Sequence, residues 1–278
     1  MAKKEITFRA SGNGALMTND KGTSITEKQL ITLKGFEAKV LEGISLTVAQ
    51  RKTYKELKDK KKAPFQLSTT AKSFVQSTWL ANEKGFYSFK KSKFLEKGLY
   101  SEEDCISLIS KVDGRFYKKN EERITKGNIS GECDIDSRFG GRRVIQDTKS
   151  TWSPETFMSA KMDLNNEWQG RCYMDLYDAD EFWLRHCLVD CPQHIYEHEV
   201  YKLKSDYNII DESLDEHKRL FDRLKTSLIY TDNKSYSLEE RVKTTVIYRD
   251  DDIFKELLDR IPFALEYYKS LKLNGFNQ

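Results

Sequence analysis

The chain has 278 residues, of which 33% are charged and 38% hydrophobic, with a formal net charge of +3. This composition is typical of a globular protein with a sizeable core. No apolar run approaches the roughly 20 residues that cross a bilayer, and the first residues lack the apolar stretch of a secretory signal, so we expect a cytoplasmic protein.

Residues 1–97 are predicted to be mostly helical and locally basic. Ser68, Thr69 and Thr70 mark the start of an amphipathic stretch that reaches Trp79. The segment from Arg51 to Lys62 holds seven basic residues against two acidic ones. Such a run suits contact with phosphates, although a solvated helix face carries the same pattern.

A helix followed by a hairpin comes next. Ser101 precedes three acidic residues, which predicts a helix start with a capping hydroxyl, and the helix should extend to about Asn120. Two β-like runs follow, Ile129 to Ile135 and Arg142 to Lys149. The residues 137–141 between them end in Gly-Gly and predict a tight hairpin connection.

The second half of the chain alternates between helical and strand patterns. Ser153-Pro154 is a helix start, and the helix should run to about Asp178. Further predicted elements are a buried strand at 181–189, a helix at 193–204 and an amphipathic helix at 253–273. This order predicts an α/β fold with a mixed central sheet flanked by helices.

Three residues at the ends of the predicted hairpin strands could carry chemistry. Asp134 and Asp147 should meet where the paired strands end, and two carboxylates there suit Mg²⁺ or Mn²⁺. Lys149 should project to the same face as Asp147, because side chains alternate along a strand. There it could orient an attacking water and balance charge on a phosphate. The alternative interpretation is a surface hairpin with ordinary charged side chains.

Five short motifs, in order, resemble the phage alkaline exonucleases related to lambda exonuclease, the YqaJ-type viral recombinase nucleases of the PD-(D/E)XK superfamily. The resemblance covers roughly residues 8–205. The motifs are Arg9-Ala10-Ser11, Gly98-x-x-x-Glu102, Gly131-Glu132-Cys133-Asp134, Asp147-Thr148-Lys149 and Gln169-x-x-x-Tyr173. The third motif has lost the proline that precedes the aspartate in the family.

The resemblance implies a role for each matched residue. Glu102, Asp134 and Asp147, with the Thr148 carbonyl, would bind one or two Mg²⁺ or Mn²⁺ ions. The other roles would be water activation by Lys149, support of the site by Gln169, packing or DNA contact by Tyr173, and binding of a terminal DNA phosphate by Arg9 and Ser11. Alternatives remain open: Glu103 could replace Glu102, Glu132 or Asp136 could be an extra ligand, Gln169 could be a surface amide, and Tyr173 could belong to the core.

The implied fold is a restriction-endonuclease-like core within a single nuclease domain, residues 1–278. Residues 1–97 would be a helical, basic DNA-binding elaboration, 98–205 the core and 206–278 a helical C-terminal part. The implied activity is 5′-to-3′ degradation of duplex DNA, in the host cytoplasm if a phage encodes the chain. The implied partners are a single-strand annealing protein and further copies of the chain in a ring. An endonuclease, a flap nuclease and a non-catalytic DNA-binding module are the alternatives.

Cysteines and histidines are the remaining candidates. The five cysteines are irregularly spaced, which favours reduced thiols over the four-cysteine iron–sulfur cluster that some nucleases of this superfamily carry. His194 and His198 are four residues apart on a predicted helix and could bridge a zinc ion, although no third ligand lies near them in sequence. We therefore expect both histidines to be surface residues.

Overall fold

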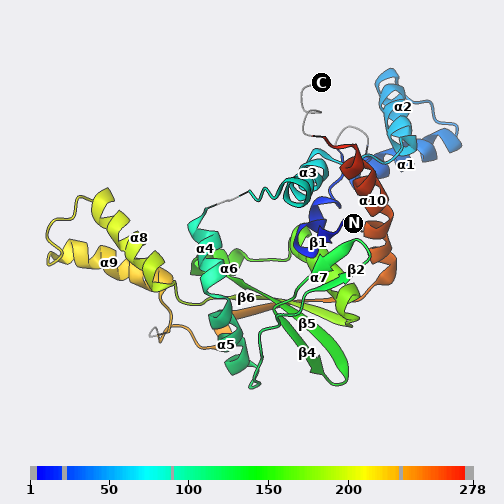
Figure 1. The fold of residues 1–278 in the computed structure, drawn as a ribbon. Helices are drawn as coiled ribbons and strands as arrows, with labels where there is room; N and C mark the ends of the chain where they lie inside the picture. The colour runs from blue at the N-terminus through cyan, green and yellow to red at the C-terminus, as the bar shows by residue number, and fades with distance from the viewer. Residues whose placement is uncertain (1–4, 21–23, 89–90, 232–233, 273–278) are drawn as a thin grey trace. The chain divides into compact units, whose positions relative to one another are not determined.

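The computed structural model describes residues 5–20, 24–88, 91–231 and 234–272. These fall into two compact units (Figure 1). The first unit comprises residues 1–13 and 88–254, and the second comprises residues 14–87 and 255–278. All the residues proposed for the site lie in the first unit.

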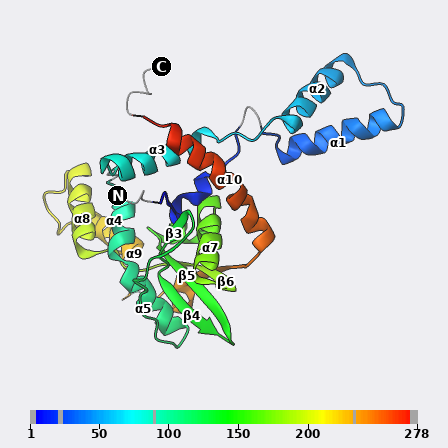
Figure 2. The ribbon, with the colours of Figure 1, turned by 45° about the vertical axis from the view of Figure 1, so that its right-hand side comes forward.

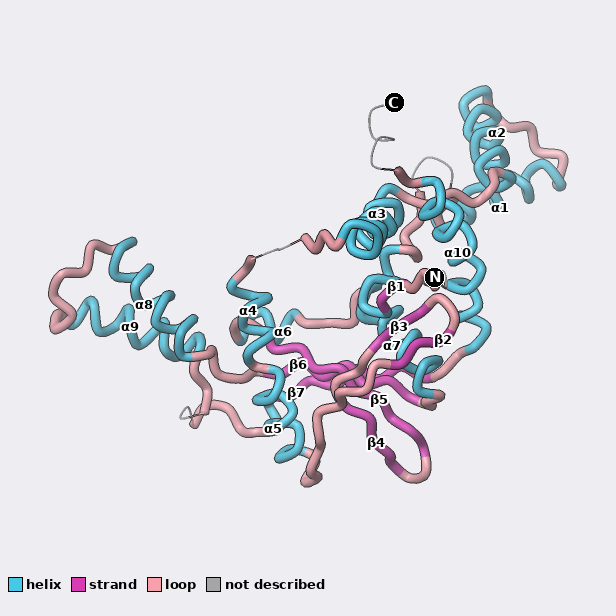
Figure 3. The backbone as a smooth tube through the Cα atoms, viewed as in Figure 1, coloured by secondary structure: helices cyan, strands magenta, loops and turns pink. Residues whose placement is uncertain are grey.

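The first unit is organised around a four-stranded mixed sheet, drawn in magenta in Figure 3. Its order is β4-β5-β6-β7, with β5 and β6 parallel and the two outer pairs antiparallel. The turn between β4 and β5 is Gly140-Gly141, and both residues have a positive φ, which fits the predicted tight hairpin. The strands are β4 (Ile135–Phe139), β5 (Arg142–Ser150), β6 (Glu181–Cys187) and β7 (Val242–Tyr248).

The first unit also contains a three-stranded sheet, and its strand pairing corrects one prediction. Its strands, in spatial order, are β1 (Phe8–Arg9), β3 (Ile129–Gly131) and β2 (Ile124–Lys126). The predicted single strand from Ile129 to Ile135 is wrong, because β3 pairs in parallel with β1, far away in sequence. The chain leaves one sheet after Gly131 and joins the other at Ile135, which places Asp134 in the link.

Two helices cover opposite faces of the four-stranded sheet. Helix α5 (Glu102–Val112) packs against Ile135 and Cys187 on one face. Helix α7 (Leu164–Tyr177) packs on the other face, where Gly170 lies directly against the ring of Phe182. The predicted mixed sheet with helices on both faces is therefore confirmed.

Several predicted boundaries change. The helix expected to reach Asn120 ends at Val112, and the one expected from 154 to 178 is broken into α6 and α7. The C-terminal part, expected to be helical, also contains β7, whose β-branched residues favour a strand. The other elements of this unit are α4 (Lys93–Tyr100), α6 (Pro154–Ser159), α8 (Gln193–Asp206), α9 (Asp215–Leu228) and two short 3-10 helices, Ala10–Ala15 and Glu239–Arg241.

Ser101 begins α5 but does not cap it. Its backbone has φ −104° and ψ 6°, because the same residue also ends α4. In that conformation the hydroxyl cannot reach the free N–H groups of the first turn, and no hydrogen bond of this kind forms. The predicted capping hydroxyl is therefore wrong, although the predicted helix start is correct.

The second unit is helical, as expected for this region (Figure 2). Near the C-terminus the chain returns to it as α10, where Tyr267 accepts a hydrogen bond from Gln76 at 2.8 Å. Its helices are α1 (Glu27–Leu41), α2 (Val48–Lys62), α3 (Thr69–Lys84) and most of α10 (Asp251–Ser270). Leu273, the predicted end of the last helix, lies outside the described residues. No helix among the described ranges is long and apolar enough to cross a membrane.

Candidate active site

Asp134 is held in one orientation by hydrogen bonds from two segments. Its Oδ2 accepts the backbone N–H of Thr148 at 2.6 Å and the Thr148 hydroxyl at 2.9 Å. Its own carbonyl accepts the N–H of Asn120 at 2.7 Å, and the Asn120 side chain donates to the Cys133 carbonyl at 3.0 Å. The link between the two sheets is therefore fixed at Asp134, directly before the first residue of β4.

The carboxyl of Asp134 resists ionisation in the metal-free protein. Burial and the nearby charge of Asp147 raise its pKa from the ordinary value to about 7, and the charge of Glu102 adds to this rise. The hydrogen bond from Thr148 and the charge of Lys149 act in the opposite direction but do not cancel the effect. The site thus accumulates negative charge that a cation would stabilise.

Asp147 and Lys149 form an ion pair on the face of β5 covered by α7. The Lys149 Nζ lies 2.5 Å from Oδ2 of Asp147, whose residue is only 3% exposed. Burial by itself would lower the pKa of Lys149, but the charge and hydrogen bond of Asp147 outweigh burial and raise it. The side chain is therefore an ammonium ion at neutral pH.

Gln169 connects the strand to helix α7. Its Nε2 donates to Oδ1 of Asp147 at 3.0 Å and to the hydroxyl of Tyr173 at 2.9 Å. Both residues are buried, which excludes a surface-amide position for Gln169. Burial, together with the charge of Asp147, raises the pKa of Tyr173, so its hydroxyl stays neutral.

A polar pocket of about 210 Å³ opens beside this network. Arg9 and Ser11 reach it from the N-terminal strand and 3-10 helix, and both are exposed. The structure therefore brings both residues to the pocket that Glu102, Asp134 and Tyr173 also line.

Three further residues on the pocket wall carry no sequence motif. Lys119, Asn120 and Arg123 come from the irregular segment after α5, part of which the sequence suggested was helical. A dense charge pattern, Lys-Lys-Asn-Glu-Glu-Arg, was the signal in the sequence, but such runs are usually solvated faces.

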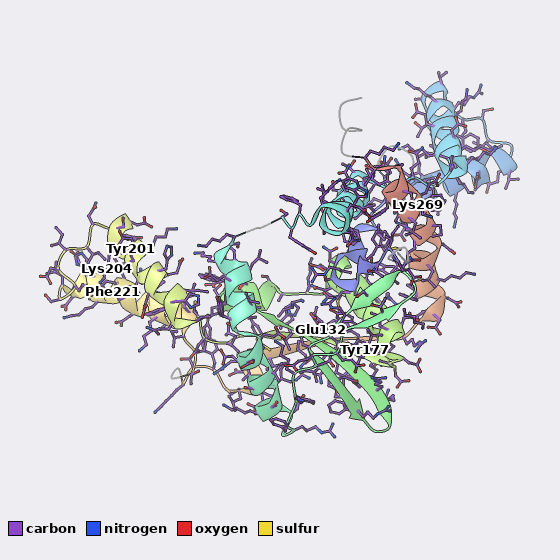
Figure 4. All side chains as sticks on the ribbon, viewed as in Figure 1. Glu132, Tyr177, Tyr201, Lys204, Phe221 and Lys269 are labelled. Atoms are coloured by element: carbon purple, nitrogen blue, oxygen red, sulfur yellow. The ribbon has the colours of Figure 1, made fainter. Side chains whose placement is uncertain are left out.

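The acidic residues left as alternatives have separate positions. Glu102 lines the pocket and pairs with Lys119 at 3.2 Å, whereas Glu103 is exposed and is not among the lining residues. Asp136 is bound by both arms of Arg143. Glu132, labelled with Tyr177 in Figure 4, lines the pocket and pairs with Arg123 at 3.1 Å.

The donor set suits a hard divalent cation. Glu102, Asp134 and Asp147 offer carboxylate oxygens, the ligands that Mg²⁺ and Mn²⁺ prefer. Among the described residues, however, no three His, Cys, Asp or Glu side chains already stand in an ion-holding cluster. Each of these carboxylates contacts a lysine or a donor of Thr148 instead, so binding an ion requires those contacts to rearrange.

The remaining candidates are the cysteines and two histidines. All five cysteines are buried free thiols. The side chain of His194, 3.2 Å from Glu96, is 51% exposed and that of His198 is 74% exposed. The expected surface position of both histidines is therefore confirmed.

One solved structure shows the same fold. The phage-related exonuclease of Haemophilus somnus 129PT superposes with a TM-score of 0.60 over 95% of this chain and 94% of its own, at 22% identity. The alkaline exonuclease LHK-Exo of Laribacter hongkongensis gives a TM-score of 0.46 over 74% of this chain and 83% of its own, at 12% identity. LHK-Exo in complex with dAMP gives 0.49 over 95% and 88%, at 11% identity. No family model and no curated protein sequence matches the chain.

Proposed function

We propose that the chain is a Mg²⁺- or Mn²⁺-dependent deoxyribonuclease that degrades duplex DNA from a 5′ end. The observation that carries this proposal is the ion pair of Asp147 and Lys149, with Asp134 bound to the intervening Thr148, beside a pocket lined by Arg9. The fold shared with a phage-related exonuclease supports the same reaction class. Intact charges at all three positions favour an enzyme over a DNA-binding module that has lost its activity.

The proposed reaction is hydrolysis of a phosphodiester. Water attacks the phosphorus, and the bond from phosphorus to the leaving oxygen breaks; one proton of the water ends on the leaving oxygen, and the other passes to solvent. A bound divalent ion would supply a more acidic water and screen the charge on the phosphate. Asp134 and Asp147 would hold the ion, with Glu102 as a third carboxylate.

Lys149 would act as a cation in this reaction. Because its pKa is raised, it would orient the attacking water and stabilise the extra negative charge of the transition state, rather than accept a proton at the outset. Gln169 would hold the carboxylate of Asp147 in position by its hydrogen bond to Oδ1. Tyr173 would support Gln169 through its neutral hydroxyl.

The preference for a DNA end is proposed from the pocket wall. Arg9 and Ser11 offer a guanidinium and a hydroxyl, which suit a terminal phosphate that carries more charge than an internal one. Exposed lysines of α2 could contact the duplex backbone. The single strands produced would be substrates for an annealing protein, and a ring of several copies would keep the enzyme on its DNA.

The experiment compares linear and covalently closed circular duplex of one sequence in Mg²⁺, Mn²⁺ and EDTA. We expect degradation of the linear duplex in either metal, none in EDTA, and survival of the circle. Arg9→Ala should slow attack on 5′-phosphorylated ends while barely changing attack on 5′-hydroxyl ends. Cleavage of the circle at the linear rate would establish an endonuclease instead, and DNA binding without cleavage in any metal would establish a binding module.

A further inference from the structure

The pocket beside Asp134 is neutralised by ion pairs between its own walls. Lys119 pairs with Glu102 at 3.2 Å, and Arg123 pairs with Glu132 at 3.1 Å. All four residues line the pocket. For Arg9, by contrast, no ion pair is found within the described ranges. Two of the three basic residues on this wall are thus engaged by acids of the same wall.

Of the three basic residues on the pocket wall, Lys119 is the one that pairs with a proposed metal ligand. Its partner Glu102 is a proposed ligand, and the charge of Asp134 also acts on the ammonium group. The side chain of Lys119 is 39% exposed and that of Glu102 26% exposed, so neither is locked in the core. An ion pair of this exposure contributes little net stability and can exchange partners readily.

From this geometry we infer that Lys119 is a displaceable counter-ion: it neutralises Glu102 until a divalent ion takes that carboxylate, and then contacts a phosphate of the DNA. The inference rests on the proposed function, since it requires Glu102 to be a ligand and DNA the substrate. Lys119 should therefore weaken the binding of the metal ion and strengthen the binding of DNA.

The chemistry supports both halves of the exchange. A divalent cation competes directly with an ammonium group for a carboxylate oxygen, so Lys119 opposes ion binding. Once released, the ammonium group remains on the pocket wall with Arg9, where a phosphate is the matching anion. A DNA phosphate would therefore replace Glu102 as the anion that pairs with Lys119.

The test is Lys119→Met, which keeps the length of the side chain and removes its charge. Calorimetry without DNA should show Mg²⁺ binding about 1.5- to 5-fold tighter than in the unmodified protein, because the competitor is gone. Binding of linear duplex in Mg²⁺, measured in a Lys149→Ala background to suppress cleavage, should weaken by about 3- to 10-fold. The slope of log affinity against log salt should fall by about one.

Two control variants make the result specific. Lys126→Met removes a lysine that pairs with Asp175 at 2.8 Å outside the pocket, and it should leave Mg²⁺ affinity unchanged. Lys119→Arg keeps the charge and should restore DNA affinity to near the original value. Circular dichroism and the melting temperature verify that each variant is folded.

The outcomes separate this inference from the proposed function. If the unmodified protein binds Mg²⁺ but Lys119→Met binds it with equal or lower affinity, or binds DNA as tightly as before, the inference is wrong and the proposed function stands. If the unmodified protein binds no Mg²⁺ at all, the proposed function fails and the inference fails with it.

Discussion

Lys149 and Asp147 form the ion pair at the centre of the proposed site, so a substitution of Lys149 tests its role in cleavage. Lys149→Ala should lower cleavage at least ~100-fold, the usual cost of losing a positioned catalytic group. The melting temperature should fall only modestly, because the Lys149 side chain is 37% exposed and Gln169 still donates a hydrogen bond to the buried Asp147 carboxylate. Single-turnover cleavage and calorimetric scans measure the two quantities. Near-normal turnover would remove Lys149 from the mechanism.

Asp134 gives a prediction about stability rather than rate. Its pKa is raised to about 7 in the folded protein, against about 3.9 in an unfolded chain. The folded state therefore binds the proton more tightly, so this group destabilises the metal-free protein increasingly between about pH 4 and pH 7, and fully above that. Below about pH 4 the penalty is absent.

Replacing Asp134 by asparagine should remove this penalty while keeping an oxygen for both Thr148 donors. In EDTA at pH 8, Asp134→Asn should be more stable than the unmodified protein by roughly 1–4 kcal/mol, and the gain should vanish near pH 4. Chemical denaturation at both pH values measures the difference. Equal stability at pH 8 would mean that Asp134 is ionised without cost. The same variant should lose Mg²⁺ binding in calorimetry.

Helix α7 sets the position of Gln169 through a close contact with the sheet. A Cβ added at Gly170 would lie 2.1 Å from an atom of the buried Phe182 ring, so the helix would have to shift. Gly170→Ala should destabilise the protein by about 1–3 kcal/mol and reduce cleavage by moving Gln169 away from Asp147. Gly35→Ala is the matched control, since a Cβ there meets no atom within 4 Å. Equal behaviour of the two variants would contradict this packing.

The sequence predicted elements whose partners are local or whose pattern is strong. Strand β6 contains the apolar run Phe182-Trp183-Leu184, and β5 directly follows the Gly-Gly turn of a local hairpin. The spacing of Asp147 and Lys149 on one face follows from the alternation of side chains along β5. The division between β3 and β4 was not predictable, because it depends on pairing with β1 more than 100 residues earlier.

The residues of the pocket wall after α5 could not be predicted either, because their role also depends on contacts that form only in the fold. Lys119 and Asn120 lie in irregular chain, where no periodicity marks a side chain as facing inward. Their importance follows from contacts with Glu102 and Cys133 that only the folded arrangement creates. Gln169, by contrast, is marked in the sequence by its spacing from Tyr173, although nothing in the sequence shows that it is buried.

Across the first unit, no three cysteines of the described residues form a group that could hold a metal ion. Cys105 of α5 packs with Cys187 of β6, while Cys191 belongs to a separate cluster with Ile195 and Leu228. Burial raises the pKa of Cys133 and of Cys172 to about 12, so both remain protonated. Protonated thiols in separate places are poor cluster ligands.

Protein purified in air should therefore be colourless and contain negligible iron per chain. Elemental analysis and the visible spectrum measure this directly, with total thiol content as the control for oxidation. Stoichiometric iron with absorbance near ~400 nm would contradict the separation of the thiols and would point to a cluster-bearing protein.

Strand β7 completes the sheet late in the chain, and this has a consequence for biosynthesis. Its partner β6 ends at Cys187, and β7 begins only at Val242. At ribosomal speeds of about 5–20 residues per second, the outer edge of β6 waits on the order of several seconds for its neighbour. An uncovered strand edge is a template for aggregation. Substitutions that weaken β7 should therefore reduce the soluble yield from cells more than the activity of each molecule that has folded.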